Sequence, residues 1–361
     1  MRAASPPCAV DAIASDTMSS AGNPVILGIE TSCDETAAAV LRGRTILSNV
    51  IASQTDIHRE YGGVVPELAS RHHLERIDAV IDLALGRAGT RLADLDAVAV
   101  TYGPGLVGPL LVGLQTAKAI AYVRKIPILG VNHLEGHLRS VFLEHPGVPF
   151  PAISLIASGG HTSLYLSSDE DRSVRLARTR DDASGEAFDK VAKLVGLGYP
   201  GGPVVDRLAK SGDRKAVPFS PPKMSDGSLD FSFSGFKTAA LRHAKARGLE
   251  RRFPAGEPDQ ETRDLLASFQ SAVVEFMVKR VMTIARKEAA RSICLSGGVA
   301  CNSLLRARLA EEAGKAGLPS CAVSPSLAGD NAAMIAEVGR RKLLLGEVAD
   351  LSLNADPGLD F

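Results

Sequence analysis

The sequence has no excess of charge of either sign, because 41 Lys and Arg residues are balanced by 41 Asp and Glu residues among 361. A basic field over the whole surface, which would favour binding to nucleic acid, is therefore excluded. A nucleic-acid partner is not excluded, since a local patch or a partner subunit can supply the positive charge.

Cysteine is scarce, and its spacing fits no CxxC pattern. The five cysteines are Cys8, Cys33, Cys294, Cys301 and Cys321. An odd number at this low density is not typical of a disulfide framework, so we expect a reduced, cytoplasmic setting.

Long apolar runs are also missing. The best candidate for a run of about 18 uncharged apolar residues, 105–123, contains Lys118 and several glycines, so we expect no membrane segment. Residues 1–23 mix Ser, Ala and Pro with Asp11 and Asp16 and lack the apolar core of a signal peptide. We interpret 1–23 as a disordered N-terminal extension.

The pattern that is present, strand, polar turn, strand and then helices, begins twice. It starts at the apolar run 25–31 and again at 152–157, where the Gly turn 158–162 follows. The repeat predicts a duplicated α/β fold of two lobes, with facing polar turns in a central cleft suited to phosphate. The expected limits are 24–150 for the N-terminal lobe, 151–350 for the C-terminal lobe and 351–361 for a tail.

A histidine pair follows the apolar run 127–131. Asn132 is a good helix N-cap, and the i, i+4 spacing of His133 and His137 places both imidazoles on one helix face. Ligand sites of open α/β sheets lie at such strand ends, and two neutral imidazoles can bind a divalent metal. The spacing alone is equally compatible with two surface or core histidines that bind no metal. Glu135 does not occupy the general-base position of H-E-x-x-H, which counts against a metalloprotease.

Asp330 lies at a predicted loop-to-helix junction, in the segment SLAGDNAAM. One interpretation is a helix N-cap. The other is a third metal ligand, since two histidines and one carboxylate leave coordination positions open for a substrate.

Two kinds of polar turn remain. The Gly-rich turns 158–160, 198–203 and 296–302 are weak signals singly, but together they favour close approach of backbone N–H groups to phosphate. None matches G-x-x-x-x-G-K-[ST], which excludes a P-loop protein. Asp34 and Glu35 in the first turn are either solvated acids or groups that orient a metal-bound phosphate or a nucleophile.

Nine longer segments resemble, in the same order, the tRNA N6-adenosine threonylcarbamoyltransferase family (TsaD). They are IETSCDET (29–36), GGVVPELASRHH (62–73), GPGLVGPLLVG (103–113), NHLEGHL (132–138), SGGHT (158–162), DDASGEAFDKVAKLVGLGYPGGP (181–203), FSFSGFKT (231–238), SGGVACN (296–302) and GDNAAMIA (329–336). The resemblance covers about residues 25–345.

The resemblance implies an actin-like (ASKHA, RNase H-like) two-lobed fold with a central cleft. It also implies transfer of the threonylcarbamoyl group of threonylcarbamoyl-adenylate to N6 of the adenosine 3′ of the anticodon in tRNAs that read ANN codons, with release of AMP. Two alternatives stay open: a metal-dependent glycoprotease and a non-catalytic ATP-binding scaffold.

The matching motifs imply roles for particular residues. His133, His137 and Asp330 would bind one divalent metal, Fe²⁺ or Zn²⁺, and Asp34 and Glu35 would be catalytic. The residues that would bind the substrate are Ile156, Ala157, Ser158, Gly159, Gly160, Asp189, Gly202 and Asn302.

The implied partners are tRNA, a partner synthase that makes threonylcarbamoyl-adenylate, and further subunits. These would be an inactive paralogue with a small ATPase, as in bacterial members, or a second copy in a homodimer, as in mitochondrial ones.

Overall fold

The computed structural model describes residues 22–250 and 258–361, so the predicted extension 1–23 lies outside the described residues except for its last two. Two five-stranded sheets have the orders β3-β2-β1-β4-β5 and β10-β9-β6-β7-β8. In each sheet three consecutive strands pair antiparallel, and the first of them also pairs parallel with a later strand. This shared topology confirms the prediction of a duplicated α/β fold.

The strands of the first sheet are β1 (Val25–Glu30), β2 (Glu35–Arg42), β3 (Thr45–Ser53), β4 (Ala97–Gly103) and β5 (Ile128–Asn132). Those of the second are β6 (Ala152–Ala157), β7 (Thr162–Ser167), β8 (Ser173–Arg178), β9 (Ser292–Ser296) and β10 (Ser320–Ala322). All residues of β1 and β6 are buried, as expected for inner strands covered on both faces.

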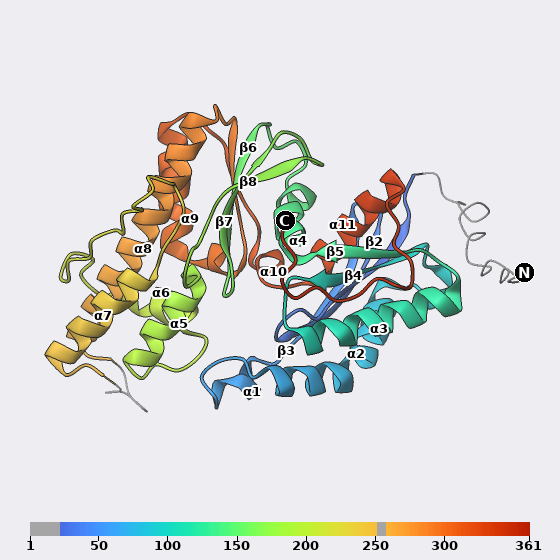
Figure 1. Ribbon diagram of the computed structural model, residues 1–361, viewed down its shortest axis with the longest axis horizontal. Coiled ribbons are helices and arrows are strands. Elements are labelled where there is room, and N and C mark those ends of the chain that lie inside the picture. Colours follow the sequence, from blue (N-terminus) through green and yellow to red (C-terminus); the bar gives the residue numbers. More distant parts are fainter. Residues whose placement is uncertain (1–21, 251–257) are drawn as a thin grey trace, which may run out of the picture.

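Helices α2 (Pro66–Ala88) and α3 (Val107–Arg124) cover one face of the first sheet, and α11 (Ala332–Leu345) covers the other (Figure 1). Gly28 in β1 allows this approach, because a Cβ there would lie 2.3 Å from the carbonyl oxygen of Ala332. The structure therefore differs from the lobe limits expected above, which place α11 in the second lobe. The helix covers apolar residues of β1 and β4, among them Ile26 and Ala99, that would otherwise face solvent.

The other helices lie at the second sheet or between the two sheets. They are α4 (His133–Glu144), α5 (Ser184–Leu194), α6 (Gly201–Ala209), α7 (Ser234–Arg247), α8 (Gln260–Lys287), α9 (Ser303–Lys315) and α10 (Pro325–Ala328), whereas the short α1 (Thr55–Arg59) links β3 to α2. Helix α4 contacts β5 and α11 on one side and β6 and β9 on the other, so it connects the lobes (Figure 1). In the described residues, no helix combines the length and apolar character needed to cross a membrane.

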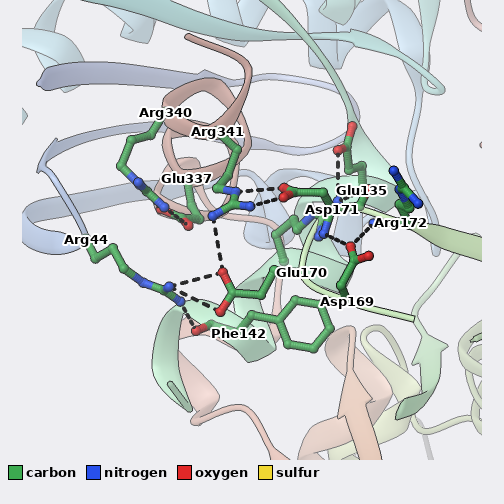
Figure 2. Close-up of polar contacts among 11 residues, drawn as sticks. Arg44, Glu135, Phe142, Asp169, Glu170, Asp171, Arg172, Glu337, Arg340 and Arg341 are labelled. Atoms are coloured by element: carbon green, nitrogen blue, oxygen red, sulfur yellow. Dashed lines mark hydrogen bonds and ion pairs between the residues drawn. The ribbon is translucent and has the colours of Figure 1, made fainter. Parts of the chain in front are cut away.

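The turn between β7 and β8 also joins the lobes, through an ion-pair network. Glu170 lies 3.2 Å from Arg44 in the β2–β3 turn and 3.3 Å from Arg341 of α11, and Arg341 also pairs with Asp171 (Figure 2). The predicted tail packs beside this contact region, where the ring of Phe361 lies 5.3 Å from that of Tyr165 in β7.

Candidate metal centre and cleft

A cleft of about 1170 Å³ lies between the lobes, where the turn after β1 and the turn after β6 both contribute to its lining. Ser32 to Glu35 come from the first turn and Ser158 to His161 from the second. The sequence repeat predicts this meeting of two polar turns, because both follow the carboxyl end of an inner strand.

Helix α4 begins directly at the carboxyl end of β5 and presents His133 to this cleft, with His137 buried behind it. Asn132 is the N-cap, and its Oδ1 accepts a 2.9 Å hydrogen bond from the backbone N–H of Leu134. His133 and His137 then lie one turn apart with their ring centroids 4.8 Å from each other. Both side chains are buried, at 6% and 0% exposure.

Asp330 completes a three-residue group with the histidines. Its Oδ1 lies 3.1 Å from Nε2 of His137 and 3.4 Å from Nε2 of His133. The N-cap of α11 is Asn331, whose Oδ1 accepts from the N–H of Met334 at 3.1 Å. Of the two interpretations of Asp330, the structure therefore supports the one in which its carboxylate faces the histidines.

The donor atoms of these three residues fit a divalent metal. They lie within 4.8 Å of one another, and the set of two imidazoles and one carboxylate suits Fe²⁺ or Zn²⁺ with open positions. Burial opposes the charge on His133, but the carboxylates of Asp330 and Glu30 outweigh it and raise the pKa of His133 well above its usual value. A site that stabilises positive charge between imidazoles and a carboxylate is suited to a cation.

The two acids of the first turn, Asp34 and Glu35, line the cleft. Burial, followed by the negative charges of Asp34 and Asp330, raises the pKa of Glu35 well above its usual range. Its Oε1 accepts a 3.2 Å hydrogen bond from the hydroxyl of Ser53. Among the described residues neither Asp34 nor Glu35 forms an ion pair. A carboxyl group with a raised pKa in a cleft is suited to general acid–base chemistry near neutral pH.

The residues expected to bind the substrate are only partly brought together. Those that line the cleft are Ser158, Gly159, Gly160, Asp189, Gly202 and Asn302. Ile156 and Ala157 are fully buried at the end of β6 and do not line it. Any contact they make with a substrate would have to come from their backbone.

Two of the lining residues also cap helices. Asp189 accepts a 2.7 Å hydrogen bond from the N–H of Gly201 at the start of α6, and Asn302 accepts one of 3.0 Å from Leu305 in α9. The side-chain amide of Asn302 further donates to Gln270. These contacts hold two helix N-termini at the cleft, where backbone N–H groups favour anions.

Three residues with polar contacts at the site are not identified as site residues by the sequence pattern. Glu30 and Ser32 contact His133, and His161 lines the cleft. Burial, together with the positive charges of His133 and His137, lowers the pKa of His161 to about 4, which makes this imidazole neutral. The signal for Glu30 is a carboxylate that directly ends an apolar strand.

Two of the matching motifs support the cleft from outside. His73, in the motif of α2, contacts the hydroxyl of Thr36 at 2.8 Å and the carbonyl oxygen of Cys33 at 3.0 Å, which holds the first turn. Gly185 lies so close to the second turn that a Cβ there would be 2.6 Å from the carbonyl oxygen of Ser158. These motifs therefore contain residues that hold the two turns in place, in addition to residues that line the cleft.

The fold and cleft place the chain in the actin-like class of two-lobed proteins. A solved structure of full-length HypF in the phosphate- and nucleotide-bound form matches 90% of this chain and 47% of that chain, with a TM-score of 0.60 and 15% identity. At this identity the likeness concerns the fold alone, and it confirms the actin-like fold implied by the sequence motifs.

The comparison of sequences is more specific. The family described as TsaD: tRNA N6-adenosine threonylcarbamoyltransferase matches residues 45–337. A relative of that name from Geobacter metallireducens is 53% identical over 92% of this chain and 95% of its own length, and one from Symbiobacterium thermophilum is 52% identical over 93% and 96%. The chain therefore belongs to the tRNA N6-adenosine threonylcarbamoyltransferase family, and it is a transferase.

Proposed function

We propose that this chain transfers the threonylcarbamoyl group of threonylcarbamoyl-adenylate to N6 of the adenosine 3′ of the anticodon in tRNAs that read ANN codons, with release of AMP. The observation that carries the proposal is the meeting of a metal-binding group, an acidic turn and a Gly turn in one cleft. It occurs in a chain that is similar over nine-tenths of its length to relatives named for this transfer.

The metal would be held by His133, His137 and Asp330, and we propose Fe²⁺, with Zn²⁺ as the second choice. A divalent cation there would hold the adenylate phosphate and offset the charge that develops on AMP as it leaves. The Gly turn 158–160 would bind the remaining phosphate oxygens through backbone N–H groups, and Asp189, Gly202 and Asn302 would hold the ribose and base of the adenylate.

The acceptor is a weak nucleophile, so the chain must position it and remove a proton. The N6 nitrogen forms a bond to the carbamoyl carbon, and the bond from that carbon to the phosphate oxygen of AMP breaks. We propose that Glu35 accepts the proton lost from N6, because its raised pKa makes it a stronger base than an ordinary carboxylate. Asp34 would keep that pKa high and orient the acceptor.

The partners follow from the proposed reaction. A synthase must supply threonylcarbamoyl-adenylate, and tRNA must reach the cleft of a chain with no net charge. We therefore propose that additional subunits complete the tRNA surface: an inactive paralogue with a small ATPase, or a second copy of this chain. The proposed location is the cytoplasm.

A reconstituted reaction tests the proposal. Purified chain, synthase, threonine, bicarbonate, ATP, accessory subunits and an unmodified ANN-decoding tRNA are combined, and the digested tRNA is analysed by nucleoside mass spectrometry. We expect a threonylcarbamoyladenosine peak that requires this chain and that a tRNA lacking the adenosine cannot give. No peak with all partners proven active would overturn the transferase proposal in favour of a scaffold.

A further inference from the structure

Glu30 is fully buried at the carboxyl end of β1, and three hydrogen-bond donors surround its carboxylate. Its Oε1 accepts a 2.5 Å hydrogen bond from the backbone N–H of Ser32, and its Oε2 accepts one of 2.6 Å from the hydroxyl of Thr101. The same Oε2 lies 2.9 Å from Nδ1 of His133. In the described part of the chain, His133 is the only ion-pair partner of Glu30.

These contacts decide which nitrogen of His133 carries a hydrogen. An ionised carboxylate only accepts hydrogen bonds, so Nδ1 of His133 is the donor toward Glu30. The hydroxyl of Ser32 lies farther from Nδ1, at 3.2 Å, and competes more weakly for the same hydrogen. The other ring nitrogen, Nε2, is then directed at Asp330, 3.4 Å from its Oδ1.

We propose that Glu30 is a positioning residue that keeps the hydrogen of His133 on Nδ1 and leaves Nε2 to bind the metal. Ligand histidines commonly donate their second N–H to a carboxylate, which fixes both the tautomer and the ring orientation. Glu30 is not part of the three-residue metal-binding group, and its carboxylate contacts His133 on the Nδ1 side. The inference rests on the metal site of the proposed function.

The three donors also explain why the residue must be a carboxylate. A glutamine has the same shape but carries an NH₂ group in place of one oxygen. Whichever way its amide turns, the NH₂ group faces either the N–H of Ser32 or the donors Thr101 and His133. Glu30→Gln therefore removes an acceptor, and its NH₂ group faces either the N–H of Ser32, which can only donate, or Nδ1 of His133, which would have to give up its hydrogen to accept.

The first test is zinc affinity, measured by competition with a chromogenic chelator. We expect Glu30→Gln to bind zinc about 10–100-fold more weakly than the wild-type protein. The matched control is Glu337→Gln, which alters another buried carboxylate that pairs with Arg340 away from the cleft. We expect wild-type zinc affinity in this control, and circular dichroism checks that both variants are folded.

The second test uses the unmutated protein, so it decides even if Glu30→Gln does not fold. In the zinc-loaded protein labelled with ¹⁵N-histidine, NMR should show His133 with hydrogen on Nδ1 and zinc on Nε2. Coordination through Nδ1, or wild-type zinc affinity in folded Glu30→Gln, would overturn the role of Glu30. Absence of zinc binding by the wild-type protein would instead overturn the metal site of the proposed function. The experiment therefore separates an error about Glu30 from an error about the metal site.

Discussion

Helix α4 lies between two clusters of charged residues that differ in how their charges are neutralised. On the side of the β7–β8 turn, three arginines pair with three carboxylates: Arg44 and Arg341 with Glu170 and Asp171, and Arg340 with Glu337 beside them (Figure 2). We call these six residues the arginine network. On the cleft side, the carboxylates of Glu30, Asp34, Glu35 and Asp330 have no Lys or Arg partner in the described residues, and the ion-pair partners of Glu30 and Asp330 are imidazoles.

This difference separates a structural cluster from a binding cluster. Guanidinium groups are permanent cations, so the arginines neutralise the carboxylates of the network without a bound metal ion. Imidazoles can lose their protons, so the cleft side can exchange protons for a metal cation and keep carboxylates available. Substitutions in the two clusters test this assignment.

Loss of a metal ligand should have the largest effect. We expect His137→Ala to lose bound metal and to reduce tRNA modification at least about 100-fold, because the charge on the leaving phosphate is no longer offset. Metal content is measured by mass spectrometry and modification by nucleoside analysis. His243→Ala in α7 is the matched control and should behave as wild type. Normal modification by His137→Ala would contradict the assignment of the cleft cluster.

Loss of the proposed base should come next. We expect Glu35→Gln to reduce the rate about 10²-fold or more with metal content unchanged. Since only the ionised carboxylate accepts a proton, the wild-type rate should fall as the pH drops through the raised pKa of Glu35, and the variant should lose this pH dependence. The exposed Glu67→Gln in α2 is the control. A variant with wild-type rate and pH profile would show that another group accepts the proton.

In the network, breaking its buried pair should affect stability and not metal binding. Glu337 and Arg340 are 3% and 7% exposed and form two hydrogen bonds of 2.7 Å. Glu337→Gln leaves Arg340 uncompensated, so we expect a loss of about 3 kcal/mol in the free energy of unfolding. Denaturant titration measures it, and the double variant Glu337→Leu, Arg340→Met should recover most of the loss. A metal defect in either variant would contradict the separation of the two clusters.

The smallest effect is expected at the more exposed part of the network. Arg341 is 24% exposed and pairs with Glu170 and Asp171 across the lobes. We expect Arg341→Ala to lower the free energy of unfolding by less than about 1 kcal/mol, with the difference shrinking at high salt. Denaturant titrations at two salt concentrations measure it, and a large salt-independent loss would show that this contact is effectively buried.

Local features of this protein follow from the sequence by itself. The apolar run that ends at Glu30 predicts β1, and Asn132 followed by two histidines four residues apart predicts the cap and metal-facing side of α4. Such features depend on neighbours within one turn or one strand. The ordered motifs likewise give the family and its fold.

Other features depend on contacts between residues far apart in the chain. The apolar pattern of α11 predicts a helix but not which sheet it covers, because two sheets offer similar apolar faces. Likewise, β8 (Ser173–Arg178) is not among the predicted strands, and α6 begins at Gly201 within a predicted turn. A helix N-cap is one sequence-based interpretation of Asp330, but Asn331 takes that position, and only the position of α4, nearly two hundred residues earlier, directs Asp330 to the histidines. The role of Glu30 arises in the same way, since Thr101 of β4 and His133 of α4 both contact it. Local periodicity in a sequence does not show which distant residues come together.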